Sequence, residues 1–185
     1  MKQIEKVLKE NYQLSHPEWE IVKNYIDLIA IKKNEFFVKQ GKVCRRLGLI
    51  EEGVMRFCMF KEDGEDITCY FASEGDFVGD YDSFMTEKPS EINLQALTDC
   101  RLSCFRRELK EALPRFMEIM ECINKNVLMG LLTQREFMMN QDATSKYELF
   151  VLKFPQVLQR APLGHIASFL GITQQSLSRL RKKIS

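Results

Sequence analysis

Residues 163–180 read LGHIASFLGITQQSLSRL, and this stretch fits a helix-turn-helix position by position. Gly171 supplies the turn, where the backbone needs a positive φ, and Ala167 is small enough for a second helix to cross closely. Thr173 is placed to cap that second helix through its hydroxyl group. The expected apolar contacts between the two helices are Ile166, Leu170, Ile172, Leu177 and Leu180. The alternative interpretation is an ordinary helical hairpin inside a protein core.

The second helix of this motif has one polar face. Leu177, Leu180 and Ile184 share the inward face, which leaves glutamine, serine and cationic side chains on the opposite one. Gln can form two hydrogen bonds with adenine, Arg can do so with guanine, and Lys suits phosphate. We therefore expect DNA contacts from Thr173, Gln174, Gln175, Ser178, Arg179 and Lys182, with Arg181 and Lys183 on the flanks.

The charge of the chain is divided between its two ends. The 27 Lys and Arg residues nearly balance the 26 Asp and Glu residues, but the last acidic residue is Glu148. Residues 149–185 hold six cations and no anion, whereas residues 1–148 hold 21 cations against 26 anions, a net charge of −5. This asymmetry indicates that the C-terminal segment contacts nucleic acid or another acidic surface. A solvated basic helix end is the alternative.

The chain before the motif changes its pattern twice. The first thirty residues read as helical, because Pro17 fits a first helical turn and Trp19, Val22, Ile26 and Ile29 recur at three- to four-residue spacing. From about residue 36 to residue 104, short stretches rich in Val, Phe, Ile, Tyr and Cys alternate with turn signals. The turns recur roughly every 10 to 12 residues, which predicts a β-roll or jelly-roll of about 70 residues.

A helical region follows Phe105. Residues 108–113 predict a short helix, and Pro114 fits the first turn of a longer one that runs to about Asn140. About 27 residues at 1.5 Å each span roughly 40 Å, which is longer than a domain of this size needs. We expect this helix to pack the β-roll on one side and a second copy of the chain on the other. The alternative is a helix that lies wholly within the monomer core.

A β-roll, a long helix and a C-terminal helix-turn-helix together resemble the Crp/Fnr family of bacterial transcription regulators over nearly the whole chain. The resemblance implies an α+β fold: a double-stranded β-helix (jelly-roll) sensor domain over residues 1–113, a dimerisation helix over 114–141 and a helix-turn-helix DNA-binding domain over 142–185. It implies a homodimeric, sequence-specific DNA-binding regulator whose partners are double-stranded DNA, itself and RNA polymerase. Its two recognition helices would enter major grooves about 34 Å apart. The alternative is a ligand-sensing or protein-interaction module that has lost DNA binding.

Residues 74–80, EGDFVGD, and the later LQAL of residues 94–97 resemble the family's phosphate-binding cassette and its outgoing strand. The resemblance implies an effector pocket at Gly75, Val78, Gly79, Asp80, Ser90 and Glu91. In members that bind cyclic nucleotides, an acidic residue holds the ribose and an arginine holds the phosphate. Here Asp80 takes the acidic position, whereas Ser90 replaces the arginine with Glu91 beside it. A carboxylate repels a phosphate, so we expect an effector other than cyclic AMP, or none.

Other classes of function lack the residues they need. The six cysteines form no C-x-x-C pair and there are only two histidines, so we expect neither a metal site nor an iron–sulfur cluster. Neither histidine falls in the β region, and no nucleophile–base pair or P-loop appears, so we do not expect an enzyme. The first residues contain no unbroken apolar stretch and no apolar run approaches membrane-spanning length, which predicts a cytoplasmic protein without a membrane partner.

The short link at residues 159–162 predicts that the family's β-hairpin wing is reduced or absent.

Overall fold

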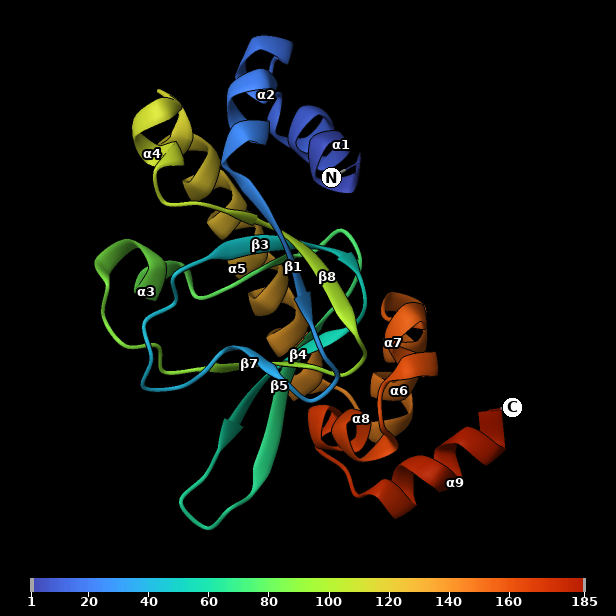
Figure 1. The fold of residues 1–185 in the computed structure, drawn as a ribbon. Helices are drawn as coiled ribbons and strands as arrows, with labels where there is room; N and C mark the ends of the chain where they lie inside the picture. Colours follow the sequence, from blue (N-terminus) through green and yellow to red (C-terminus); the bar gives the residue numbers. More distant parts are fainter. Residues whose placement is uncertain (1, 185) are drawn as a thin grey trace.

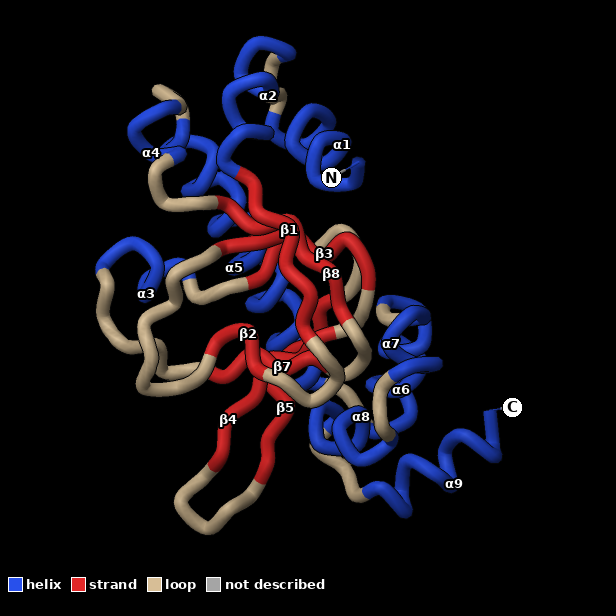
Figure 2. The backbone as a smooth tube through the Cα atoms, viewed as in Figure 1, coloured by secondary structure: helices blue, strands red, loops and turns tan. Residues whose placement is uncertain are grey.

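The computed structural model describes residues 2–184, with the side chains of residues 133–137, 140, 183 and 184 outside the description. Two antiparallel four-stranded sheets form a β-roll at its centre (Figures 1 and 2). The first sheet has the order β1 (Ile26–Ile31), β8 (Cys100–Phe105), β3 (Leu47–Glu52) and β6 (Phe77–Val78). The second has the order β2 (Phe36–Val38), β7 (Asn93–Ala96), β4 (Met55–Phe60) and β5 (Asp66–Ala72). The α+β class with a β-roll, which the sequence predicted, is confirmed.

The N-terminal segment is helical only in part. It forms α1 (Lys2–Tyr12), α2 (His16–Val22) and a single 3₁₀ turn, η1 (Lys23–Tyr25). Ser15 caps α2, and the Glu18 carboxylate accepts a hydrogen bond from the Ser15 backbone N–H in return. The predicted helix over the first thirty residues is wrong for Ile26 and Ile29, because both lie in β1, which pairs with β8 along its whole length. The run of isoleucines suits a strand edge better than a helix.

The long helix packs its first half into the β-roll. The chain passes through α3 (Tyr81–Thr86) and α4 (Leu109–Ala112) and then enters α5 (Phe116–Asn140), which ends where the sequence predicted. Figure 1 shows α5 running behind the sheets from the N-terminal helices toward the C-terminal ones. Phe116, Ile119, Met120 and Ile123 are buried in the same core as both sheets. Among the described residues, neither α5 nor any other helix is both long enough and apolar enough to cross a membrane.

The C-terminal helices form a second core together with one corner of the β-roll. They are α6 (Ala143–Lys153), α7 (Pro155–Arg160), α8 (Leu163–Leu170) and α9 (Gln174–Ile184). Phe71 of β5 is fully buried among them, with its ring centroid 5.9 Å from that of Phe150 and 5.2 Å from that of Phe169. Val54 and Leu97 of the β-roll belong to the same cluster. The C-terminal helices therefore pack against the β-roll through apolar side chains, in addition to their chain connection to α5.

Candidate nucleic-acid interface and ligand cavity

The turn between α8 and α9 has the geometry of a helix-turn-helix. Gly171 has a φ of +68°, and the next amide, Ile172 N–H, donates to the carbonyl of Ala167 at 3.0 Å. Thr173 caps α9, because its hydroxyl oxygen accepts a hydrogen bond from Ser176 N–H at 3.1 Å. Ile166, Ala167, Leu170 and Leu177 are buried between the helices, and Ile172 and Leu180 pack against them. The local arrangement that residues 163–180 predicted is therefore present.

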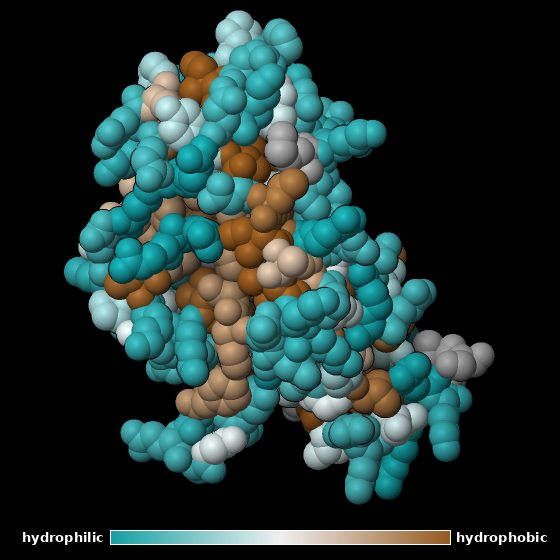
Figure 3. Space-filling view, viewed as in Figure 1, coloured by the Kyte–Doolittle hydropathy of each residue, from teal (hydrophilic) through white to brown (hydrophobic). Residues whose placement is uncertain are grey.

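The polar face of α9 is open to solvent. The side chains of Thr173, Gln174, Gln175, Ser178, Arg179 and Lys182 are all exposed. Figure 1 places α9 at the end of the molecule opposite the N-terminal helices, and hydrophilic side chains predominate there in Figure 3. The sequence predicted Ile184 on the inward face of this helix and Lys183 on a flank, but both side chains lie outside the described residues. Between Gln141 and Ile184 the described residues form helices α6 to α9 and no strand.

Helix α8 covers the free edge of a sheet, because β5 is the last strand of its sheet. Thr68 N–H of this strand donates to Ser168 Oγ at 3.0 Å, and the same hydroxyl donates to the carbonyl of Asp66 at 3.3 Å. A serine side chain thus takes the place of a neighbouring strand at this edge. Burial, and after it the charge of the nearby Arg56, lowers the pKa of His165 on the same helix. The His165 imidazole is half-buried in the neighbourhood of Arg56.

Arg56 stabilises the sheet beneath α8. Its side chain is only 2% exposed, and its guanidinium donates to both carboxylate oxygens of Asp66 at 2.6 Å. It also donates to Thr68 Oγ1 at 2.9 Å and to Gln95 Oε1 at 2.8 Å. A buried cation with this full set of partners ties β4, β5 and β7 together under α8.

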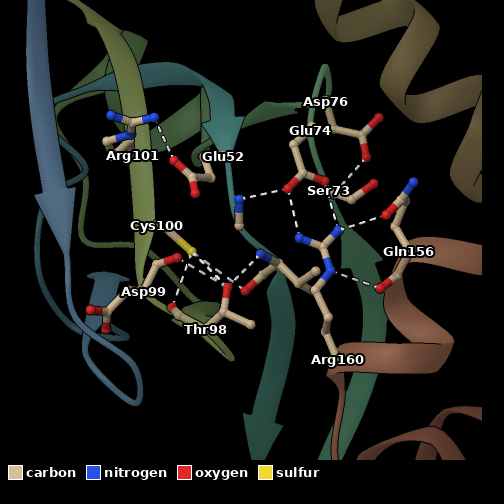
Figure 4. A network of polar contacts seen from close by, with 12 residues as sticks. Glu52, Ser73, Glu74, Asp76, Thr98, Asp99, Cys100, Arg101, Gln156 and Arg160 are labelled. Carbon is tan, nitrogen blue, oxygen red and sulfur yellow. Dashed lines mark hydrogen bonds and ion pairs between the residues drawn. The ribbon is translucent and has the colours of Figure 1, made fainter.

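A second polar contact joins the β-roll to α7 (Figure 4). Arg160 donates to the two carboxylate oxygens of Glu74 at 2.6 and 2.7 Å, and Gly53 N–H donates to the same carboxylate at 2.8 Å. The hydrogen bond from Arg160 is the largest of the causes that lower the pKa of Glu74 to about 2. Gly53 must be glycine, because its φ is +112° and a Cβ atom there would lie 2.5 Å from the sulfur of Cys100. Neither the Glu74–Arg160 pair nor the Ser168 contact was predicted from the sequence.

A cavity of about 790 Å³ lies between the β-roll, α1 and α5. Four of the predicted pocket residues line it: Gly75, Val78, Gly79 and Asp80. Ser90 and Glu91 do not line it. Ser90 lies behind the wall, 2% exposed, and Glu91 is exposed to solvent. Sequence reasoning missed the contribution of α1, which adds Val7, Asn11 and Tyr12 to the wall.

Asp80, the residue expected to bind a ribose, forms hydrogen bonds close to its own loop instead. One carboxylate oxygen of Asp80 accepts Ser83 N–H at 3.0 Å and so caps α3, and the other accepts the Ser90 hydroxyl at 2.7 Å. The Asp80 carboxylate therefore occupies the Ser83 N–H at the start of α3, an amide that a phosphate would otherwise be free to use. The replacement of arginine by Ser90 thus has a structural counterpart: the two residues bond to each other instead of to a nucleotide.

The cysteines of the described chain are unpaired thiols. All six are free, and no cluster of three or more His, Cys, Asp or Glu side chains that could hold a metal occurs among the described residues. Burial raises the pKa of Cys58 to about 11 and that of Cys104 to about 12. Thiols of this kind stay protonated and act as small apolar side chains.

Comparison with known proteins agrees with this architecture. Residues 28–114 match the cyclic nucleotide-binding domain family. Among solved structures, the chain is similar to FixK2 from Bradyrhizobium japonicum, with a TM-score of 0.74, 14% identity and coverage of 86% of this chain and 84% of that one. No curated protein sequence matches the chain.

Two further solved structures share this likeness. A protein described as a Crp/Fnr-family transcriptional regulator from Eubacterium rectale has a TM-score of 0.67, 15% identity and coverage of 96% and 87%. A CRP-family transcriptional regulator from Thermus thermophilus has a TM-score of 0.67, 17% identity and coverage of 84% and 83%. These structural neighbours are transcription regulators and not enzymes. At these identities the likeness shows a shared fold.

Proposed function

We propose that this chain is a homodimeric, sequence-specific DNA-binding transcription regulator of the Crp/Fnr type. The observation that carries the proposal is the exposed polar face of α9, which is held by a glycine turn and a threonine cap against a buried α8. Its glutamines and Arg179 suit base edges, and Lys182 suits phosphate. The body of the chain carries −5 and the segment after Glu148 carries +6, so the field of the molecule turns this end toward DNA.

The proposal divides the chain into a sensor domain over residues 1–113, a dimerisation helix over 114–141 and a DNA-binding domain over 142–185. Helix α5 is suited to pairing with a second copy, because apolar side chains remain exposed along it. They are Met117, Leu128, Met129, Leu132 and Met139. A dimer would present two recognition helices to a site with approximate two-fold symmetry. RNA polymerase is the further partner that the family resemblance implies, and the cytoplasm is the matching compartment.

Fluorescence anisotropy with genomic DNA fragments tests the proposal. We expect affinity that falls as salt rises, because phosphate contacts release counterions. Replacing Gln175, Arg179 and Lys182 by Ala should weaken binding at least tenfold. The matched control is Lys110→Ala on α4, an exposed cation at the far end of the molecule, which should leave binding unchanged. Binding that the α9 substitutions leave unaltered would refute the recognition face. No salt-dependent binding to any fragment would favour a sensing module that has lost DNA binding.

A further inference from the structure

The cavity beside the loop of residues 74–80 has mostly apolar walls. Helix α5 turns Ile123, Val127 and Leu131 toward it, and the sheets add Phe57 and Phe77. Its volume of about 790 Å³ falls within the range of small-molecule sites, which is roughly 300–1,000 Å³. A ligand of this size would be surrounded by aliphatic and aromatic side chains, so apolar surface must make up most of it.

Helix α1 forms part of the cavity wall. Its carboxyl end places Val7, Asn11 and Tyr12 there, and the Tyr12 ring meets the edge of Phe77 with centroids 5.8 Å apart. The amino end of the helix is tied to β3, because the Glu51 carboxylate lies 3.3 Å from Ile4 N–H and accepts its hydrogen bond. The helix therefore holds a fixed place over the cavity, and it contributes one amide and one phenol to the wall.

The charged groups of the cavity all have the same sign. Asp76, Asp80 and Asp82 line it, and none of the described residues around it is Lys, Arg or His. Asp76 and Asp80 are half-buried and Asp82 is exposed, and the Asp76 Oδ2 accepts a hydrogen bond from Ser73 N–H at 2.8 Å. An anionic ligand would meet three carboxylates with no cation to offset them, whereas a cation or a neutral donor would be attracted.

We infer that this cavity binds a largely apolar small molecule without negative charge, which presents a hydrogen-bond donor or a positive charge to Asp76. The inference rests on the proposed function, in which this cavity is the effector pocket, and it names the chemistry of the effector. The contacts proposed here differ from those that hold a cyclic nucleotide. Apolar contacts with α5 and the sheets supply the binding energy, and the loop at residues 74–80 accepts hydrogen bonds from the ligand instead of donating them to a phosphate.

Two fluorescent probes that differ by one charged group test this inference with the full chain in the absence of DNA. N-phenyl-1-naphthylamine is apolar and neutral, whereas 8-anilinonaphthalene-1-sulfonate adds an anionic sulfonate to nearly the same rings. We expect saturable binding of the neutral probe at one molecule per chain, and at least tenfold weaker binding of the sulfonate. A fluorescent cyclic AMP derivative should fail to bind. Equal binding of both probes would overturn the charge argument.

Substitution at Gly130 tests the location. This α5 glycine lines the cavity, and a Cβ atom built on it meets no other atom within 4 Å. Gly130→Phe should fill the space and weaken binding of the neutral probe at least tenfold. Gly130→Ala adds little volume, and alanine suits a helix better than glycine does, so binding should stay within twofold. Unchanged binding in Gly130→Phe, with an unaltered thermal unfolding temperature, would refute the site. Arg179→Ala, which should impair DNA binding alone, separates this failure from a failure of the proposed function.

Discussion

The ion pair between Glu74 and Arg160 should determine how firmly the C-terminal helices pack on the β-roll. The two residues are 86 positions apart in the chain, and their bidentate contact joins the loop after β5 to α7. The substitution Glu74→Gln keeps the size of the side chain and an oxygen for Gly53 N–H, but it removes the charge that Arg160 binds. We expect the variant to fold and its C-terminal helices to separate from the β-roll more often.

The magnitude follows from the pKa of Glu74. A fall from 4.5 to about 2 corresponds to about 3 kcal/mol, at roughly 1.4 kcal/mol for each pH unit. The Arg160 and Glu74 side chains are 28% and 26% exposed, so water screens the pair, and we expect a loss of roughly 2 kcal/mol in the variant. Because the folded-state pKa lies below the unfolded-state value, this stabilisation is complete above pH 4.5 and disappears as the pH falls through 2.

Native-state hydrogen exchange and urea unfolding measure this effect. At pH 7, the amides of α8 and Thr68 N–H should exchange roughly 30-fold faster in Glu74→Gln, which is the factor for about 2 kcal/mol. The difference in unfolding free energy between wild type and variant should stay constant from pH 7 to 5 and shrink between pH 4.5 and 2. The control is Glu65→Gln, which breaks an exposed pair with Lys61 and should cost less than about 0.5 kcal/mol. Equal losses in Glu65→Gln and Glu74→Gln would refute the reasoning.

Two further substitutions test the same packing, and a third tests the proposed dimer. Phe71→Ala should lower the free energy of unfolding by about 3–5 kcal/mol in urea, because it leaves a cavity among buried rings; a loss below about 1 kcal/mol would contradict the shared core. Ser168→Ala should cost about 1–3 kcal/mol, because Thr68 N–H loses its acceptor, and faster exchange confined to that strand edge is the check. Leu128→Asp on α5 should shift sedimentation from dimer toward monomer, whereas Leu152→Asp on α6, a more exposed leucine, should not. A monomeric wild type would refute the pairing.

The helix-turn-helix could be predicted because its determinants are local. Gly171 is the residue type that tolerates a φ of +68°, and Thr173 is the type that caps a helix, so eighteen consecutive residues were enough. Strand β1 could not be predicted in the same way. Its apolar residues also fit a three- to four-residue spacing, and only pairing with β8, about 75 residues later, decides for a strand. Long-range pairing overrode the local pattern there.

The interface between the β-roll and the C-terminal helices could not be predicted for a related reason. Thr68 and Ser168 are 100 residues apart, and each is an ordinary small polar residue in its own element. Phe71 looks like any other strand residue until α6 and α8 surround it. The pocket shows the same limit on a shorter scale. The sequence identified Ser90 as the position of a missing arginine, but only the structure shows its hydroxyl bonded to Asp80 behind the wall.

One segment links the two proposed sites. The loop of residues 73–76 gives Glu74 to Arg160 on α7, while its next two residues, Gly75 and Asp76, line the cavity (Figure 4). Coupling between a ligand and DNA requires that the ligand bind two arrangements of the DNA-binding helices with different affinity. A molecule that bonds to Asp76 acts on backbone two residues from the Arg160 partner, so a shift of this loop changes the contact that holds α7. If coupling runs through this loop, the free-energy difference that a ligand can produce is limited by what the Glu74–Arg160 pair contributes, roughly 2 kcal/mol or about 30-fold in DNA affinity.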